Sequence, residues 1–141
     1  MTELASPNLL LNISTELAAL VGKAAASVVA VHSHRMRSSG FVWRPGLIVT
    51  ADEALADEGE FAIQRPGGDE VPAQLLGRDP STDIALLRVN RADLQPVATA
   101  APPTTVGALA IVVAAHEGSP TAALGVVSRT GPSWRSLRGG R

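Results

Sequence analysis

The chain has 141 residues, with 12 Lys and Arg against 13 Asp and Glu and a formal net charge of −1 at pH 7. This length suits one domain with its own core, and the balanced charge gives no electrostatic footprint for a nucleic acid or an anionic membrane. The sequence has no cysteine, which excludes disulfides, thiolate metal sites and a cysteine nucleophile. Nothing in the composition implies a cofactor.

Residues 1–26 are predicted to form a short N-terminal helix. Ser6-Pro7 is typical of a helix start, with proline at the first helical position. Apolar residues then recur at spacings of three and four, as in an amphipathic helix: Leu10, Ile13, Leu17, Leu20 and Val21. This apolar stripe either packs on the rest of the domain or docks a partner. Because Glu3 and Glu16 flank the first apolar stretch and no basic residue precedes it, we expect no signal peptide and a cytoplasmic location.

Residues 27–93 alternate between β-branched runs and turn signals, which predicts six short strands. These strands read SVVAVHSH, SSGFVW, GLIVT, EFAIQR, EVPAQLLGR and DIALLRV. Arg44-Pro45-Gly46 and the PGGD of residues 66–69 are typical of hairpin turns. A short helical turn with five carboxylates in Asp52–Glu60 is expected between the third and fourth strands. Six such strands predict one closed β-barrel.

The C-terminal third predicts the start of a second structure. Residues 94–105 contain three prolines and are expected to form a crossover. Residues 106–131 contain two more strand patterns, ALAIVVAAH and TAALGVVSR, separated by Glu117–Pro120. Residues 132–141 form a basic tail without a clear element. The longest apolar run, Val106–Ala115, is too short to span a membrane. The fold class is therefore all-β, with one complete barrel plus the first strands of a second, preceded by a short helix.

The order of these pieces resembles the HtrA/DegP-like branch of the trypsin-fold serine proteases. The most specific match is GRDPSTDIALLRV, residues 77–89, and the resemblance extends over residues 27–131. It implies a chymotrypsin-fold N-terminal barrel and the start of the second barrel. It also implies a site in which a serine attacks, a histidine removes its proton and an aspartate orients that histidine.

The resemblance assigns two residues of this chain to positions of that catalytic site. Asp83 stands at the position of the triad aspartate, although by residue type alone it could equally open a strand or cap a turn with Asp79 and Ser81. Glu53 stands at the position of the triad histidine. A carboxylate there sets two like charges where the mechanism needs an imidazolium beside a carboxylate, so we expect Glu53 to be non-functional. No serine lies in the G-x-S-G-G setting that the family's nucleophile requires.

The histidines and the basic tail suggest weaker sites. His32 and His34 are expected on one face of the first strand, where they would need His116 or a carboxylate from elsewhere to bind a metal. Strand-edge histidines with ordinary hydrogen bonds are the favoured interpretation, so no metal is expected. Arg135 and Arg138 form a small anion patch or, more simply, a solvated tail.

Three functions follow as hypotheses. The first is a pseudoprotease with a binding or regulatory role, inactive as an isolated chain, whose ligand is a peptide or a protein. The second is the N-terminal part of a split or processed serine endopeptidase whose serine and oxyanion hole lie on another piece. The third is a β-barrel interaction module unrelated to proteases. One barrel with a fraction of another exposes strand edges and apolar surface, which predicts a complementary C-terminal fragment or another protein subunit as a partner.

Overall fold

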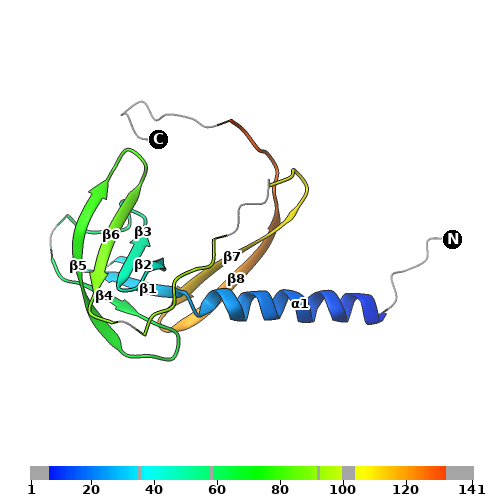
Figure 1. Ribbon diagram of the computed structural model, residues 1–141, viewed down its shortest axis with the longest axis horizontal. Helices are drawn as coiled ribbons and strands as arrows, with labels where there is room; N and C mark the ends of the chain where they lie inside the picture. Colours follow the sequence, from blue (N-terminus) through cyan, green and yellow to red (C-terminus); the bar gives the residue numbers. More distant parts are fainter. Residues whose placement is uncertain (1–6, 35, 58, 92, 100–103, 133–141) are drawn as a thin grey trace.

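The computed structural model describes residues 7–34, 36–57, 59–91, 93–99 and 104–132 (Figure 1). Helix α1 (Pro7–Ala25) comes first, and the strands follow in chain order: β1 (Val28–Ser33), β2 (Met36–Arg44), β3 (Leu47–Thr50), β4 (Phe61–Gln64), β5 (Glu70–Asp79), β6 (Ile84–Val89), β7 (Leu109–His116) and β8 (Ser119–Val126). Each of the six barrel strands and both later strands lies where the sequence predicts it. The all-β class with a short N-terminal helix is confirmed.

Strands β1 to β6 form a closed antiparallel barrel in the order β1-β2-β3-β6-β5-β4. Along β6, Ala85, Leu87 and Val89 are buried in the barrel, whereas Arg88 is exposed on the outside. This alternation is typical of a barrel, in which every second side chain of a strand points outward. The largest buried side chains, which fill the interior, are Ile48, Ile63, Leu87, Val29, Val31 and Val42.

The two later strands form a separate two-stranded sheet, β7-β8. Glu117 and Gly118 alone join them, and both have positive φ angles, 47° and 72°. Two-residue hairpin loops of the I′ type require this conformation at both positions. The turn is therefore tighter than the four residues expected from the sequence, and Ser119 and Pro120 belong to β8.

The β7-β8 hairpin packs against the outside of the barrel with one face. Val28 and Ala30 of β1 form a small buried cluster with Ala115 of β7. The Ser39 hydroxyl of β2 donates to the Ala115 carbonyl and accepts from the Ala115 N–H, each at 3.0 Å. Four large apolar side chains of the hairpin remain exposed: Leu109, Val112, Leu124 and Val126.

Helix α1 extends away from the barrel and contacts β1 and β7 near its C-terminal end (Figure 1). Ala25 is buried there, while Leu10, Ile13 and Leu20 of the predicted stripe are exposed. The stripe therefore packs on the domain only in its last turns. Pro7 is the first helical residue, as predicted, and its expected N-cap Ser6 lies outside the described residues. Among the described residues, no helix has both the length and the apolar character that crossing a membrane requires.

Candidate functional site

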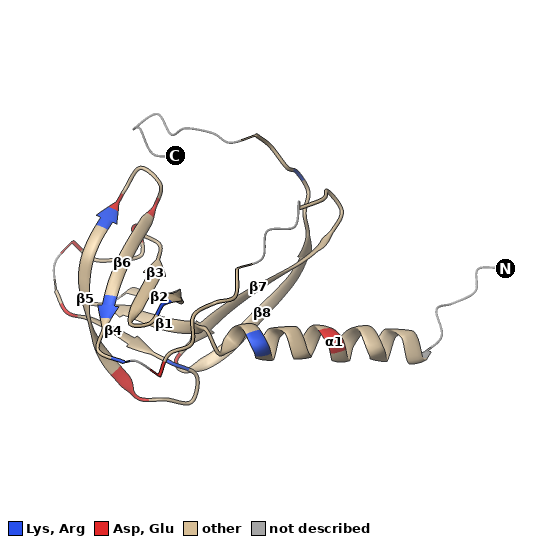
Figure 2. Cartoon of the chain, in the orientation of Figure 1, with Lys and Arg blue, Asp and Glu red and all other residues tan. Residues whose placement is uncertain are grey.

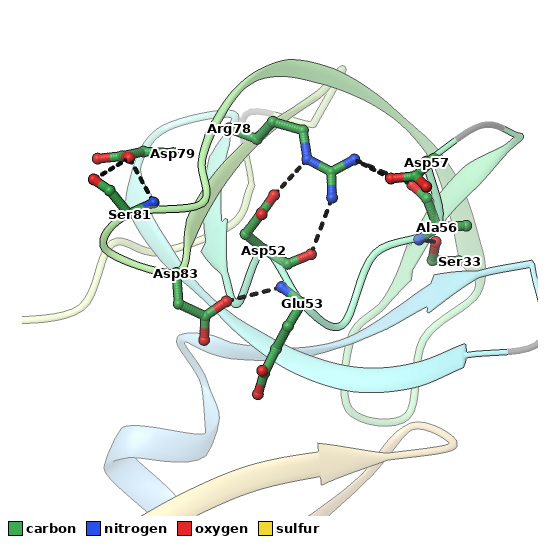
Figure 3. Close-up of polar contacts among 9 residues, drawn as sticks. All are labelled: Ser33, Asp52, Glu53, Ala56, Asp57, Arg78, Asp79, Ser81 and Asp83. Carbon is green, nitrogen blue, oxygen red and sulfur yellow. Dashed lines mark hydrogen bonds and ion pairs between the residues drawn. The ribbon is translucent and has the colours of Figure 1, made fainter. Parts of the chain in front are cut away.

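The two residues assigned to one site by the sequence meet at one end of the barrel. Asp83, directly before β6, has a φ of 56°, a left-handed conformation that aspartate tolerates better than most residues. Its Oδ1 accepts a hydrogen bond from the backbone N–H of Glu53 at 2.8 Å (Figure 3). The Asp83 carbonyl also accepts from the N–H of Asp52 at 3.3 Å. Strand β6 and the turn after β3 are thus joined at the point where the resemblance places the orienting aspartate and the base.

The hydrogen bond between Glu53 and Asp83 uses the backbone of Glu53. Both side chains are exposed, and the Glu53 side chain extends out of its turn (Figure 3). Among the described residues, no hydrogen bond joins the two carboxyl groups and no serine hydroxyl bonds to either of them. The Asp83 carboxylate therefore caps the turn after β3, whereas the alternative from residue type had it open a strand or cap the turn with Asp79 and Ser81. The catalytic roles assigned by resemblance to Asp83 and Glu53 stay predictions.

The turn that carries Glu53 is held from inside by Arg78 of β5. Asp52 is only 6% exposed, and the Arg78 guanidinium forms an ion pair with its carboxylate. The same guanidinium donates to the Asp52 carbonyl at 3.2 Å and to the Ala56 carbonyl at 3.4 Å. The expected helical turn is a single turn in which the Leu55 N–H donates to the Asp52 carbonyl at 3.0 Å. The acidic run is thus not uniformly solvated, because Asp52 is buried against Arg78.

A second buried contact fixes the far end of this turn. The Ser33 hydroxyl lies in the barrel interior at the end of β1 and accepts the Ala56 N–H at 2.8 Å. Sequence reasoning missed Ser33, Asp52 and Arg78. The sequence did contain a signal for the ion pair. Arg78 is the one cation of the GRDPSTD segment, and five carboxylates lie in the connection between β3 and β4. Nothing in the strand pattern around Ser33 indicated its partner.

The turn before Asp83 is organised by Asp79. One of its carboxylate oxygens accepts from the Ser81 N–H at 2.9 Å and from the Ser81 hydroxyl at 2.6 Å. The other accepts from the Thr82 hydroxyl at 2.8 Å. The Ser81 and Thr82 hydrogen bonds lower the pKa of Asp79, because they stabilise the charged form of the carboxylate. Asp79 therefore stays ionised and holds the loop that presents Asp83.

The histidines do not converge as the metal alternative required. His34 lies beyond the end of β1 with a φ of 51°, so it does not share a strand face with His32. His116 closes β7 and is exposed. In the part of the chain that the structure describes, no three His, Asp or Glu side chains are grouped closely enough to hold a metal ion. Arg135 and Arg138 lie outside the described residues.

The chain is similar in sequence to known proteins. A family model described as a trypsin-like peptidase domain matches residues 38–141. A probable periplasmic serine endoprotease DegP-like protein of Bartonella henselae is 40% identical over 63 residues, which are 41% of this chain and 12% of that protein. A protein of the same name from Pseudomonas fulva is 38% identical over 60 residues, or 42% of this chain and 12% of that protein. The chain thus aligns with about an eighth of the length of these relatives.

Solved structures agree with the barrel and the hairpin. The serine endoprotease from Yersinia pestis matches with a TM-score of 0.72 and 25% identity, covering 79% of this chain and 43% of its own. The inactive form of the Rv3671c protease, a protein of M. tuberculosis H37Rv, matches with a TM-score of 0.71 and 27% identity, covering 82% of this chain and 60% of its own. These matches exclude the unrelated interaction module. The chain belongs to the trypsin-like peptidase domain family, in its HtrA/DegP-like branch.

Proposed function

We propose that this chain is a pseudoprotease, a trypsin-like scaffold that binds a peptide or protein and does not cleave it. The observation that carries this proposal is the hydrogen bond from the Glu53 N–H to Asp83 Oδ1. This bond supports the proposal, because the glutamate that the resemblance assigns to the histidine position lies beside the carboxylate that the resemblance assigns to the orienting aspartate. On this proposal the scaffold of the site is retained while its proton acceptor differs.

The chemistry of a carboxylate at this position opposes triad catalysis. A histidine base becomes an imidazolium in the transition state, and the neighbouring aspartate stabilises that positive charge. A glutamate that takes a proton becomes neutral, so it gains nothing comparable from Asp83. Before it takes the proton, its negative charge is repelled by Asp83. Glu53 is also exposed, so its carboxylate is solvated.

The purified chain is therefore expected to release no acid-soluble peptides from unfolded casein. Glu53→Ala and Asp83→Ala are expected to give the same background, with Glu16→Ala on helix α1 as a surface control. Hydrolysis by the wild-type chain that disappears in the Asp83 and Glu53 variants but persists in the Glu16 variant would refute the pseudoprotease proposal.

A second function is favoured by the uncovered surface of the β7-β8 hairpin. We propose as the alternative that the chain is the N-terminal part of a split or processed serine endopeptidase, completed by another polypeptide. Strands β7 and β8 carry no Asp, Glu, Lys or Arg (Figure 2), and Val112 is 67% exposed. Asp83 is exposed as well, although a triad aspartate works as a buried group. A complementary C-terminal fragment or another protein subunit seated on the hairpin would bury this apolar face and its unpaired strand edges.

Native mass spectrometry of the protein isolated from its source is expected to find the chain bound to such a polypeptide. Val112→Lys is expected to weaken the complex, because it places a charge in the apolar contact, whereas Glu16→Lys is expected to leave it intact. A monodisperse species of the mass of this chain alone, about 14.5 kDa, would count against the alternative.

The names of the relatives are also evidence on where in the cell this protein is located. The Bartonella henselae and Pseudomonas fulva proteins are both named as periplasmic. These names favour a location outside the cytoplasm for this chain as well. The cytoplasmic location expected from residues 1–26 stays a prediction that the relatives do not support.

A further inference from the structure

The barrel has a cavity of about 930 Å³, away from the residues of the turn after β3 that contact Asp83. Its lining comes from the β1-β2 hairpin, the residues before β4, and strands β4 and β5. The pairing register places Arg37, His32, Ala62 and Pro72 in one row across β2, β1, β4 and β5. Neither Glu53 nor Asp83 lines the cavity, so its role does not depend on whether the chain cleaves peptides.

His32 is the unusual residue of this cavity. Its side chain is only 12% exposed, and both ring nitrogens are buried without a hydrogen bond in the described structure. The Glu70 carboxylate lies 3.2 Å from Nδ1 but is not aligned for a hydrogen bond. Buried polar groups in proteins are normally hydrogen-bonded, so an imidazole with only this Glu70 contact is an unusual group in the wall of a cavity.

The charges around His32 favour a cationic ligand. Glu60 and Glu70 contribute two carboxylates to the lining, against one guanidinium from Arg37. That guanidinium already donates to the carbonyls of His34 and Met36, at 3.3 and 3.2 Å. A neutral imidazole adds one hydrogen-bond acceptor. An anion would meet two carboxylates, whereas an ammonium or guanidinium group would meet acceptors.

One apolar residue in the row with His32 suits the stem of a basic side chain. Pro72 offers apolar contact to methylene groups. Ligand pockets range over roughly 300–1,000 Å³, so this cavity holds more than one side chain. We propose that the cavity binds a short peptide segment by inserting a lysine or arginine side chain between Glu60 and Glu70.

Site-resolved NMR titration of the folded chain tests this proposal. The probe is a capped five-residue alanine peptide with one central lysine, and the matched control replaces that lysine with norleucine. The lysine peptide is expected to shift the backbone amide signals of His32, Phe61 and Ala62. Glu70→Gln is expected to weaken its binding about tenfold, because a hydrogen bond to a charged group is lost. Glu16→Gln, far from the cavity on helix α1, is expected to leave the affinity unchanged.

Glu60→Gln serves as a second variant, because Glu70→Gln also removes the carboxylate that lies beside His32. Glu60→Gln is expected to weaken binding of the lysine peptide several-fold. The proposal is overturned if the lysine peptide shifts no cavity residue, or if the norleucine peptide binds equally well. It is also overturned if neither glutamate variant weakens binding. Equal affinity for n-butylammonium, a free small cation, would contradict the peptide as the ligand.

Discussion

Replacing Arg78 with alanine is expected to lower the free energy of unfolding by about 3 kcal/mol. The substitution leaves the Asp52 carboxylate, 6% exposed, without the cation that neutralises it, and removes donors to two backbone carbonyls. Removing one partner of a buried ion pair typically costs 3–5 kcal/mol, and because Arg78 keeps 26% of its side chain exposed the lower end of that range applies. Chemical denaturation followed by circular dichroism measures the change.

Arg65→Ala provides the matched control, because Arg65 also pairs with a carboxylate but at the surface. It contacts Asp93 at 2.6 Å, and Asp93 keeps Arg91 as a second partner. Loss of an exposed ion pair of this kind is expected to cost less than about 1 kcal/mol. Equal losses in the two variants would show that the Arg78 contact is no more important than a surface salt bridge, and that the turn carrying Glu53 is held by other means.

The strands and turns were predictable because their signals are local. The alternation of β-branched residues marks β1 to β6, and the Pro-Gly pairs at residues 45–46 and 66–67 mark two of their hairpins. The pairing of Asp83 with the turn after β3 was predictable only through the family resemblance, since 30 residues separate Glu53 from Asp83. No periodicity links two segments at that distance.

Contacts that depend on the closed barrel could not be predicted from local sequence patterns. Arg78 reaches Asp52 across 26 residues, and Ser33 reaches Ala56 across 23. A carboxylate in an acidic run is solvated in most proteins, so its burial follows only from the position of Arg78 inside the barrel. His34 was placed on a strand because the alternating pattern continues through it, yet the backbone turns there to start the β1-β2 hairpin. For helix α1, periodicity predicted the apolar stripe but not which part of it the domain covers.

Introducing an imidazole through Glu53→His is expected to give a group whose pKa lies above the ordinary histidine value of about 6.5. Asp83 accepts the backbone N–H of this residue and stands beside it, and a nearby carboxylate stabilises the charged imidazolium. The pKa of the introduced imidazole therefore rises, because its protonated form is stabilised. An additional Asp83→Asn substitution removes the charge but keeps an oxygen that can accept the same backbone N–H. It is expected to lower the pKa of the introduced imidazole by about one unit.

The NMR titration of this imidazole, compared with and without Asp83→Asn, tests most directly whether Asp83 and Glu53 stand where a trypsin-like site holds its aspartate and its base. Glu16→Gln in the Glu53→His background is the control, since Glu16 is an exposed carboxylate on helix α1 and its loss is expected to change the pKa little. The predicted result is a pKa drop of about one unit that is specific to the Asp83→Asn substitution. The same pKa with and without the Asp83 carboxylate would contradict the assignment of these two positions.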